Sequence, residues 1–178
     1  MTGKALALVN DELRRRPDVD FDFVDPATLE LSPPGRASSP ATLEYLNRTI
    51  GGATGVILAT PEYHGSYSSV MKLVIENLNF PSALSGKPIG LLGVAAGVIG
   101  AIKALEHLRS ICSHVGGLVL PGAVSVAQVN TVFDEEGRCL DAAVEKRIRG
   151  VATHMIDHIQ QTDCPKIALE EMVRSGTR

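Results

Sequence analysis

The chain has 178 residues, enough for one well-buried domain and short for two. Hydrophobic residues make up 44% of it and aromatic residues only 4%, so the core must be built mainly from Ala, Val, Ile and Leu. The formal net charge of −3 argues against nucleic-acid and anionic-membrane partners, which would favour a basic patch. No stretch approaches the roughly 20 apolar residues that a membrane-spanning helix needs.

Three cysteines, Cys112, Cys139 and Cys164, are far apart in the sequence and odd in number. This spacing is not that of a disulfide framework, and it predicts reduced thiols. The first residues do not lead into the apolar segment and cleavage site of a secretory signal. Together these features predict a cytoplasmic protein.

The first third of the chain switches between helical and strand periods. A helix is expected over residues 4–16, where Pro17 ends it. Residues 19–25 alternate apolar with acidic side chains, which predicts a half-buried or edge strand. Residues 26–40 contain four prolines and are expected to form a loop, and a helix is expected over residues 41–50.

The rest of the chain contains short, wholly apolar runs, typical of strands covered on both faces. These predicted strands span residues 55–59, 89–96 and 118–126, the last interrupted by Pro121-Gly122. Helices are expected over residues 68–78, 99–115 and 140–159.

Strands that alternate with helices predict an α/β fold, with a parallel sheet between two layers of helices. Residues 1–162 are expected to form the domain. Residues 163–178 are expected to form a polar tail, either a short helix or disordered.

Ligands on a parallel sheet bind beyond the carboxyl ends of its strands, so the loops that follow the strands are the candidate sites. The first such loop is residues 60–69, TPEYHGSYSS. Pro61 is expected to end the strand, Gly65 to permit a tight turn, and one of the serines, Ser66, Ser68 or Ser69, to cap the next helix. Such a loop presents backbone N–H groups to a planar ring edged with oxygen and nitrogen atoms. A purely structural turn accounts for the same residue types.

The second loop is residues 95–101, after the next apolar strand. Its small side chains let the backbone approach a flat ligand from the ligand's other edge. A Gly-x-x-Gly spacing is weak on its own, because helix-entry turns use it routinely.

Residues 60–78, TPEYHGSYSSVMKLVIENL, resemble the Pro-Glu-Tyr-Asn-Gly-Ser signature of the NAD(P)H-dependent FMN reductases and their quinone-, azo-dye- and chromate-reducing relatives. His64 stands where this family often has Asn. The second loop follows Gly86-Lys87-Pro88, as the corresponding loop does in the family. The similarity extends from the first helix to about Ile159.

The resemblance implies a flavodoxin-like three-layer sandwich, FMN as cofactor and NADPH or NADH as hydride donor. Hydride would pass from the nicotinamide to the flavin and then to an acceptor, so no side chain is assigned as an acid or base. Tyr63 and His64 are the nearest candidates if one is tested. The implied flavin-binding residues are Pro61, Glu62, Tyr63, His64, Gly65, Ser66, Ala96, Gly97 and Gly100.

The helices that follow the two loops carry broad apolar faces. In the family such helices pack across subunits, which predicts a homodimer or homotetramer. Burial within one subunit explains much of the same pattern.

The start of the sequence departs from the family pattern. The family opens with a buried strand and a Gly-Ser-x-Arg-x-Gly-Ser loop, which holds the FMN phosphate at a helix N-terminus. Here the residues after Met1 already resemble that helix, and only Thr2 replaces the loop's last hydroxyl. The first strand is therefore expected to be missing, with strands 19–25 and 55–59 facing each other across an empty row.

Three explanations of this departure stay open: a start codon assigned too late, a gene fragment, or a protein that no longer uses FMN. Two functions accordingly compete with a reductase. One is a non-catalytic flavodoxin-like remnant or interaction subunit that has lost FMN. The other is a flavin carrier without reductase activity.

A metal pair is geometrically possible at His154 and His158, which lie four residues apart on the last long helix. No third ligand pattern lies nearby, so we interpret both as solvated helix residues and predict no metal site.

Overall fold

The computed structural model describes residues 1–176. Its first element is α1 (Thr2–Arg14), which buries Ala5, Val9 and Leu13 at helical spacing on one face. An extended segment with a 3-10 turn, η1 (Pro26–Thr28), leads to α2 (Pro40–Gly52). Within the described residues, no helix is both long and apolar enough to cross a membrane.

The sheet is built around β3 (Pro88–Val94), all of whose residues are buried, as its unbroken apolar run predicts. β1 (Val56–Tyr63) lies parallel to one side of β3. β4 (Leu118–Val119) and β5 (Val124–Val126) lie parallel to the other side, on either side of Pro121-Gly122. β2 (Ser66–Tyr67) forms an antiparallel hairpin with the end of β1.

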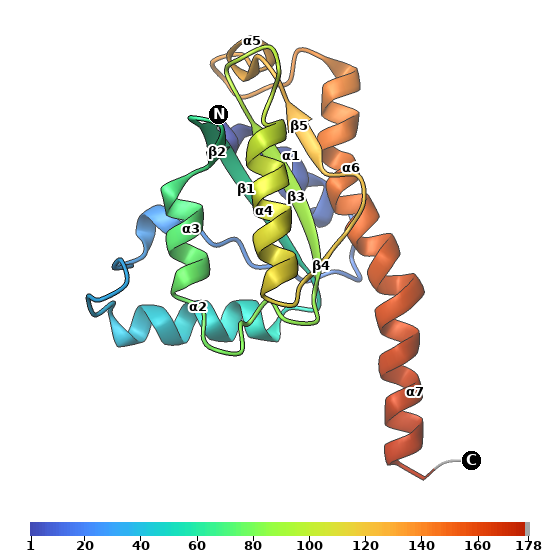
Figure 1. Cartoon of the computed structure of the whole chain (residues 1–178). Helices are drawn as coiled ribbons and strands as arrows, with labels where there is room; N and C mark the ends of the chain where they lie inside the picture. The colour runs from blue at the N-terminus through green and yellow to red at the C-terminus, as the bar shows by residue number, and fades with distance from the viewer. Residues whose placement is uncertain (177–178) are drawn as a thin grey trace.

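Helices cover both faces of this sheet (Figure 1). α3 (Ser69–Glu76) and α4 (Ile102–His114) lie over one face, and α1 and α6 (Ala142–His158) over the other. A short helix, α5 (Val129–Val132), was not expected from the sequence. After α6 the chain continues through a π-helical turn, η2 (Ile159–Asp163), into α7 (Cys164–Arg174). The predicted parallel sheet between two helical layers is confirmed.

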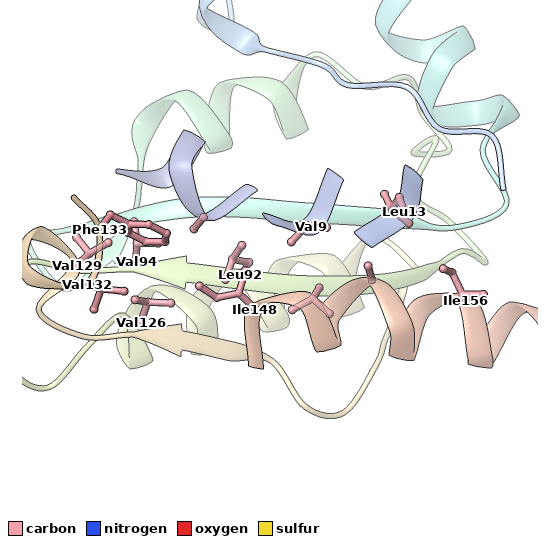
Figure 2. Close-up of a cluster of buried hydrophobic side chains, with 13 residues drawn as sticks. Val9, Leu13, Leu92, Val94, Val126, Val129, Val132, Phe133, Ile148 and Ile156 are labelled. Carbon is pink, nitrogen blue, oxygen red and sulfur yellow. The ribbon is translucent and has the colours of Figure 1, made fainter. Parts of the chain in front are cut away.

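The core has two principal parts because successive residues of β3 point to opposite faces. Ile89 and Leu91 pack with α3 and α4. Leu92 and Val94 pack with α1, α5 and α6, in the cluster that Figure 2 shows. Each fully buried Leu, Ile or Val contributes about 1.5–3 kcal/mol, so the aliphatic composition supports the core without tryptophan.

Residues 19–25 do not form the predicted edge strand. Val19 and Phe21 pack on the cluster of α1 and α6, and Val24 packs on the other cluster. The alternating pattern therefore reflects half-burial of an extended segment, without the shared N–H···O=C bonds that define a strand. Among residues 1–176, β1 has β3 along one side and only the two-residue β2 on the other, at Glu62 and Tyr63.

Two element boundaries also differ from the sequence prediction. β1 does not stop at Pro61, which stays in register with Val94. A proline is tolerated there because a strand without a full neighbour on one side loses no ladder bond. α4 begins at Ile102 and not at residue 99, because residues 97–101 form a turn. The tail takes the helical alternative, as α7.

Arg149 links α1 and α6, the two helices that cover one face of the sheet. Its side chain is only 18% exposed and donates to Asp11 Oδ2 at 2.6 Å on α1 and to Glu145 Oε1 at 2.8 Å on α6. The hydrogen bond from Arg149 holds the pKa of Asp11 below its ordinary value.

We expect Arg149→Met to lower the free energy of unfolding by about 1–3 kcal/mol, because two carboxylates lose a partly buried, charged donor. Urea unfolding measures the change. Arg48→Met is the control, since Arg48 makes only an exposed pair within α2 and should change stability by less than about 0.5 kcal/mol. Equal effects of the two substitutions would contradict the assigned role of Arg149.

Candidate functional site

A tight hairpin stands at the carboxyl end of β1. Tyr63 pairs with Ser66, so only His64 and Gly65 form the turn. Their φ angles are +51° and +74°. Two positive φ values in a two-residue loop are the mark of a type I′ turn, which favours Asn-Gly. The predicted tight turn at Gly65 is confirmed, and His64 carries the conformational strain.

We expect His64→Asn to raise the free energy of unfolding by about 0.5 kcal/mol, because Asn adopts positive φ more readily than His. His64→Val should lower it by about 1–3 kcal/mol, because a β-branched residue is poorly tolerated there. Urea unfolding of both variants and the wild type shows whether their free energies of unfolding follow this order. His114→Val, the same replacement within helix α4, is the control and should have a smaller effect.

Thr60 closes the base of the hairpin. Its side chain is fully buried, its Oγ1 donates to the Pro61 carbonyl at 3.0 Å, and the same atom accepts from the Ser68 backbone N–H at 3.0 Å. Ser68 in turn caps α3 by accepting from the Met71 N–H at 3.2 Å. Of the three serines considered as caps, Ser68 is therefore the one used. Sequence reasoning missed Thr60, although a hydroxyl at the end of an apolar strand was a usable signal.

The second loop has exposed backbone N–H groups that lack an acceptor within the described residues. Ala96, Gly97, Val98 and Ile99 are all exposed, and none of their backbone N–H groups has an acceptor among residues 1–176. The Gly97 carbonyl points inward instead, and it accepts from the backbone N–H groups of Gly100 and Gln128 at 3.3 and 3.1 Å. The loop therefore has backbone donors available to a ligand.

The two loops are joined at the N-terminus of α4. The N-cap residue, Ala101, has no side chain able to accept a hydrogen bond. Glu62 supplies the missing acceptor from the hairpin, since its Oε2 accepts from the Ala104 N–H at 3.0 Å. Ser125 at β5 accepts from the Ala101 N–H at 2.8 Å. A carboxylate at this position also complements the positive end of the helix dipole.

A second contact fixes the hairpin to α4. Ser66 Oγ lies 3.0 Å from His107 Nδ1, and the tautomer of the imidazole decides which atom donates. His107 thus lies on the helix surface and has a local structural partner.

The predicted site residues come together at one end of the sheet. Tyr63, His64, Ala96 and Gly97 are exposed there, whereas Gly100 is buried and serves the turn with φ of +80°. The N–H groups of His64 and Gly65 also have no acceptor among the described residues. The N-terminus of α1, whose first N–H groups suit an anion, lies at the same end (Figure 1). This arrangement suits a flat ligand rich in acceptors with an attached anionic group.

Residues 1–131 match the model of a protein family described as NADPH-dependent FMN reductase. The chain belongs to this family. The resemblance inferred from the hairpin sequence is therefore confirmed.

Two relatives show the range of this FMN reductase family. The chain is 33% identical over 102 residues to a 2-hydroxy-1,4-benzoquinone reductase from Burkholderia sp, covering 55% of this chain and 56% of the relative. It is 34% identical over 82 residues to an FMN-dependent NADPH-azoreductase from Staphylococcus aureus, covering 46% and 43%. The chain thus spans about half the length of the curated relatives it matches.

Solved structures confirm the flavodoxin-like fold. The flavoenzyme NAD(P)H:(acceptor) oxidoreductase FerB from Paracoccus denitrificans superimposes with a TM-score of 0.75 at 22% identity, covering 90% of each chain. A Fusobacterium nucleatum flavodoxin bound to flavin mononucleotide gives a TM-score of 0.53 at 17% identity, covering 89% of this chain and 91% of that one.

Residues 1–176 contain no group of three His, Cys, Asp or Glu side chains arranged to hold a metal ion. A groove of about 920 Å³ lies away from the two loops, along α6.

Proposed function

We propose that this FMN reductase family member is a flavin-dependent NAD(P)H oxidoreductase that holds FMN between the hairpin, residues 61–66, and the loop at residues 96–100. The observation that carries the proposal is the set of N–H groups on both loops that have no acceptor within the described residues. The hydrogen bond from Ala104 to Glu62 holds the two loops in a fixed relation. The edge of an isoalloxazine ring carries the oxygen and nitrogen acceptors that such donors bind. We assign the cofactor to the unit formed by residues 1–162.

FMN, when bound, supplies the hydride chemistry of such enzymes. The residues of this chain bind and orient the ring through Pro61 to Ser66, Ala96 and Gly97, and the buried Gly100 holds the turn that positions the second loop. The N-terminal N–H groups of α1, from Thr2 onward, suit the phosphate. Tyr63 and His64 are exposed beside the turn, where they are placed to orient a substrate.

We further propose that the acceptor is a flat, largely apolar molecule such as a quinone or an azo compound. Tyr63, Val98 and Ile99 expose their side chains beside the proposed ring position. An apolar surface of this kind favours an aromatic acceptor over a metal oxyanion. The quinone and azo-compound reductases among the relatives support the same class.

A homo-oligomer and a cytoplasmic location complete the proposal. Most apolar residues of α3 and α4 are buried within the subunit, but Val70 and Ile102 remain exposed and could pack against a second copy. The three cysteines are free, which supports a reducing compartment.

The test is a titration of the purified chain with FMN, followed by flavin fluorescence and absorbance, and then by NADPH and NADH oxidation with a quinone. We expect saturable binding at micromolar FMN and cofactor oxidation that depends on it. No binding up to about several hundred micromolar would overturn the proposal and favour a remnant without flavin. Binding without nicotinamide oxidation would instead identify a flavin carrier.

A further inference from the structure

Helix α7 extends away from the body of the molecule and buries none of its residues (Figure 1). Five of its apolar residues recur at positions i, i+3, i+4, i+7 and i+8, which places them on one face of the helix. We call this face the α7 stripe: Pro165, Ala168, Leu169, Met172 and Val173. Leu169, Met172 and Val173 are 62%, 60% and 76% exposed. An 11-residue helix is marginal by itself, so an unpacked stripe calls for a partner surface.

A groove of about 920 Å³ runs along the outer face of α6, between that helix and the segment that leads into β5. We call it the α6 groove. Small apolar residues line much of it: Gly122, Ala123, Val124, Ala142 and Gly150. A Cβ atom added to Gly150 would meet nothing within 4 Å, so another helix can approach the backbone of α6 closely there.

Charges of both signs lie beside the two surfaces, since Glu12 and Glu145 line the α6 groove together with Arg149, which pairs with both. Lys146 and Arg147 line the α6 groove, and neither has an ion-pair partner among residues 1–176. Arg147 makes only a hydrogen bond to the Ser125 carbonyl, at 3.3 Å. On α7, Glu170 pairs with Arg174 at 3.8 Å, and Lys166 and Glu171 carry opposite charges.

The lengths of the two surfaces also agree. The 11 residues of α7 span about 16 Å, and residues 142–154 of α6 span about 20 Å. Because α6, η2 and α7 follow one another with little change of direction (Figure 1), α7 points away from the groove of its own chain. A two-fold axis near η2 would instead place α7 of one copy antiparallel to α6 of the other. Leu169 of the first copy would then lie near Gly150 of the second.

The π-helical turn orients the stripe for this contact. If α6 and α7 formed one unbroken α-helix, the α7 stripe and the side of α6 that lines the groove would point about a quarter-turn apart around the helix axis. A π turn holds more residues than an α turn, and so η2 rotates α7 back toward the groove side. His158 Nε2 and Asp163 Oδ2 lie 3.7 Å apart across this turn.

We propose that the α7 stripe docks in the α6 groove of a second copy of this chain, and that the second copy returns the same contact. Such a reciprocal contact is isologous and closes as a dimer. It is separate from the exposed residues of α3 and α4, and it does not depend on flavin binding.

The first test is cross-linking between two singly substituted proteins, both carrying Cys164→Ser. Gly150→Cys in one is mixed with Leu169→Cys in the other, oxidised with copper phenanthroline and run on a non-reducing gel. We expect a disulfide-linked dimer from this mixture. Ile167→Cys replaces Leu169→Cys in the control, because Ile167 is exposed on the side of α7 opposite the stripe. No cross-link, or equal cross-linking of both mixtures, overturns the proposal.

The second test measures molar mass by analytical ultracentrifugation at about 20 μM protein. Leu169→Asp is expected to halve the mass of the assembly, whereas Ile167→Asp leaves it unchanged. Circular dichroism melts show whether both variants keep the fold, as substitutions in an exposed helix should. A monomeric wild-type chain, or a Leu169→Asp variant with the wild-type mass, overturns the proposal.

Discussion

Replacing Glu62 with Ala is expected to weaken FMN binding about tenfold or more and to lower the free energy of unfolding by about 1–2 kcal/mol. The carboxylate caps α4 by accepting from the Ala104 N–H at 3.0 Å, and the helix has no side-chain cap of its own. Without Glu62 an N–H group at the helix start loses its partner, and the charge that complements the dipole is removed. The hairpin would also lose its bond to the helix that begins beside the second loop.

FMN titration and urea unfolding measure these two effects. Glu62→Gln keeps an oxygen that can accept from Ala104 but removes the charge, so its losses should be intermediate. Glu106→Ala is the matched control, because Glu106 is an exposed carboxylate on the same helix that makes no hydrogen bond to the hairpin within the described residues. If Glu62→Ala bound FMN and unfolded as the wild type does, the two loops would not depend on this contact.

Replacing Gly100 with Ala is expected to cost about 2–4 kcal/mol of folding free energy. Gly100 has φ of +80°, which L-residues with a Cβ rarely adopt. An added Cβ would also clash with Ser125 Oγ, the atom that accepts from the Ala101 N–H. The substitution therefore strains the turn and disturbs the start of α4 together.

Gly97→Ala separates the stability of the loop from its ligand contact. A Cβ at Gly97 would meet nothing within 4 Å, so urea unfolding of this variant should match the wild type within about 0.5 kcal/mol. If FMN lies against the loop, the methyl group should still weaken binding severalfold in the flavin titration. Unchanged FMN binding by Gly97→Ala would show that the flavin ring does not lie against residues 96–99. Unchanged stability of Gly100→Ala would show that the turn relaxes to accept the new side chain.

The amino-acid sequence was enough to predict the alternating helices and strands, the parallel sheet and the position of the two loops. These follow from short-range properties. An unbroken apolar run such as residues 89–94 can be satisfied only inside a sheet, and a His-Gly pair between Tyr63 and Ser66 can form a two-residue turn. The resemblance to the FMN reductases rested on this same hairpin segment, and family membership confirms it.

The hydrogen-bond partners within the site could be found only from the way distant segments pack together. The alternating pattern at residues 19–25 predicted a strand, but a strand also needs a neighbouring backbone, and the described chain places none beside it. Nothing local in the sequence indicated that Glu62 caps a helix 42 residues away or that Ser125 shares this task. Capping by distant residues depends on how β1, β5 and α4 meet at one end of the sheet. Only the packing of these elements fixes that arrangement, because hydrogen-bond geometry is set by distances in space and not by spacing along the chain.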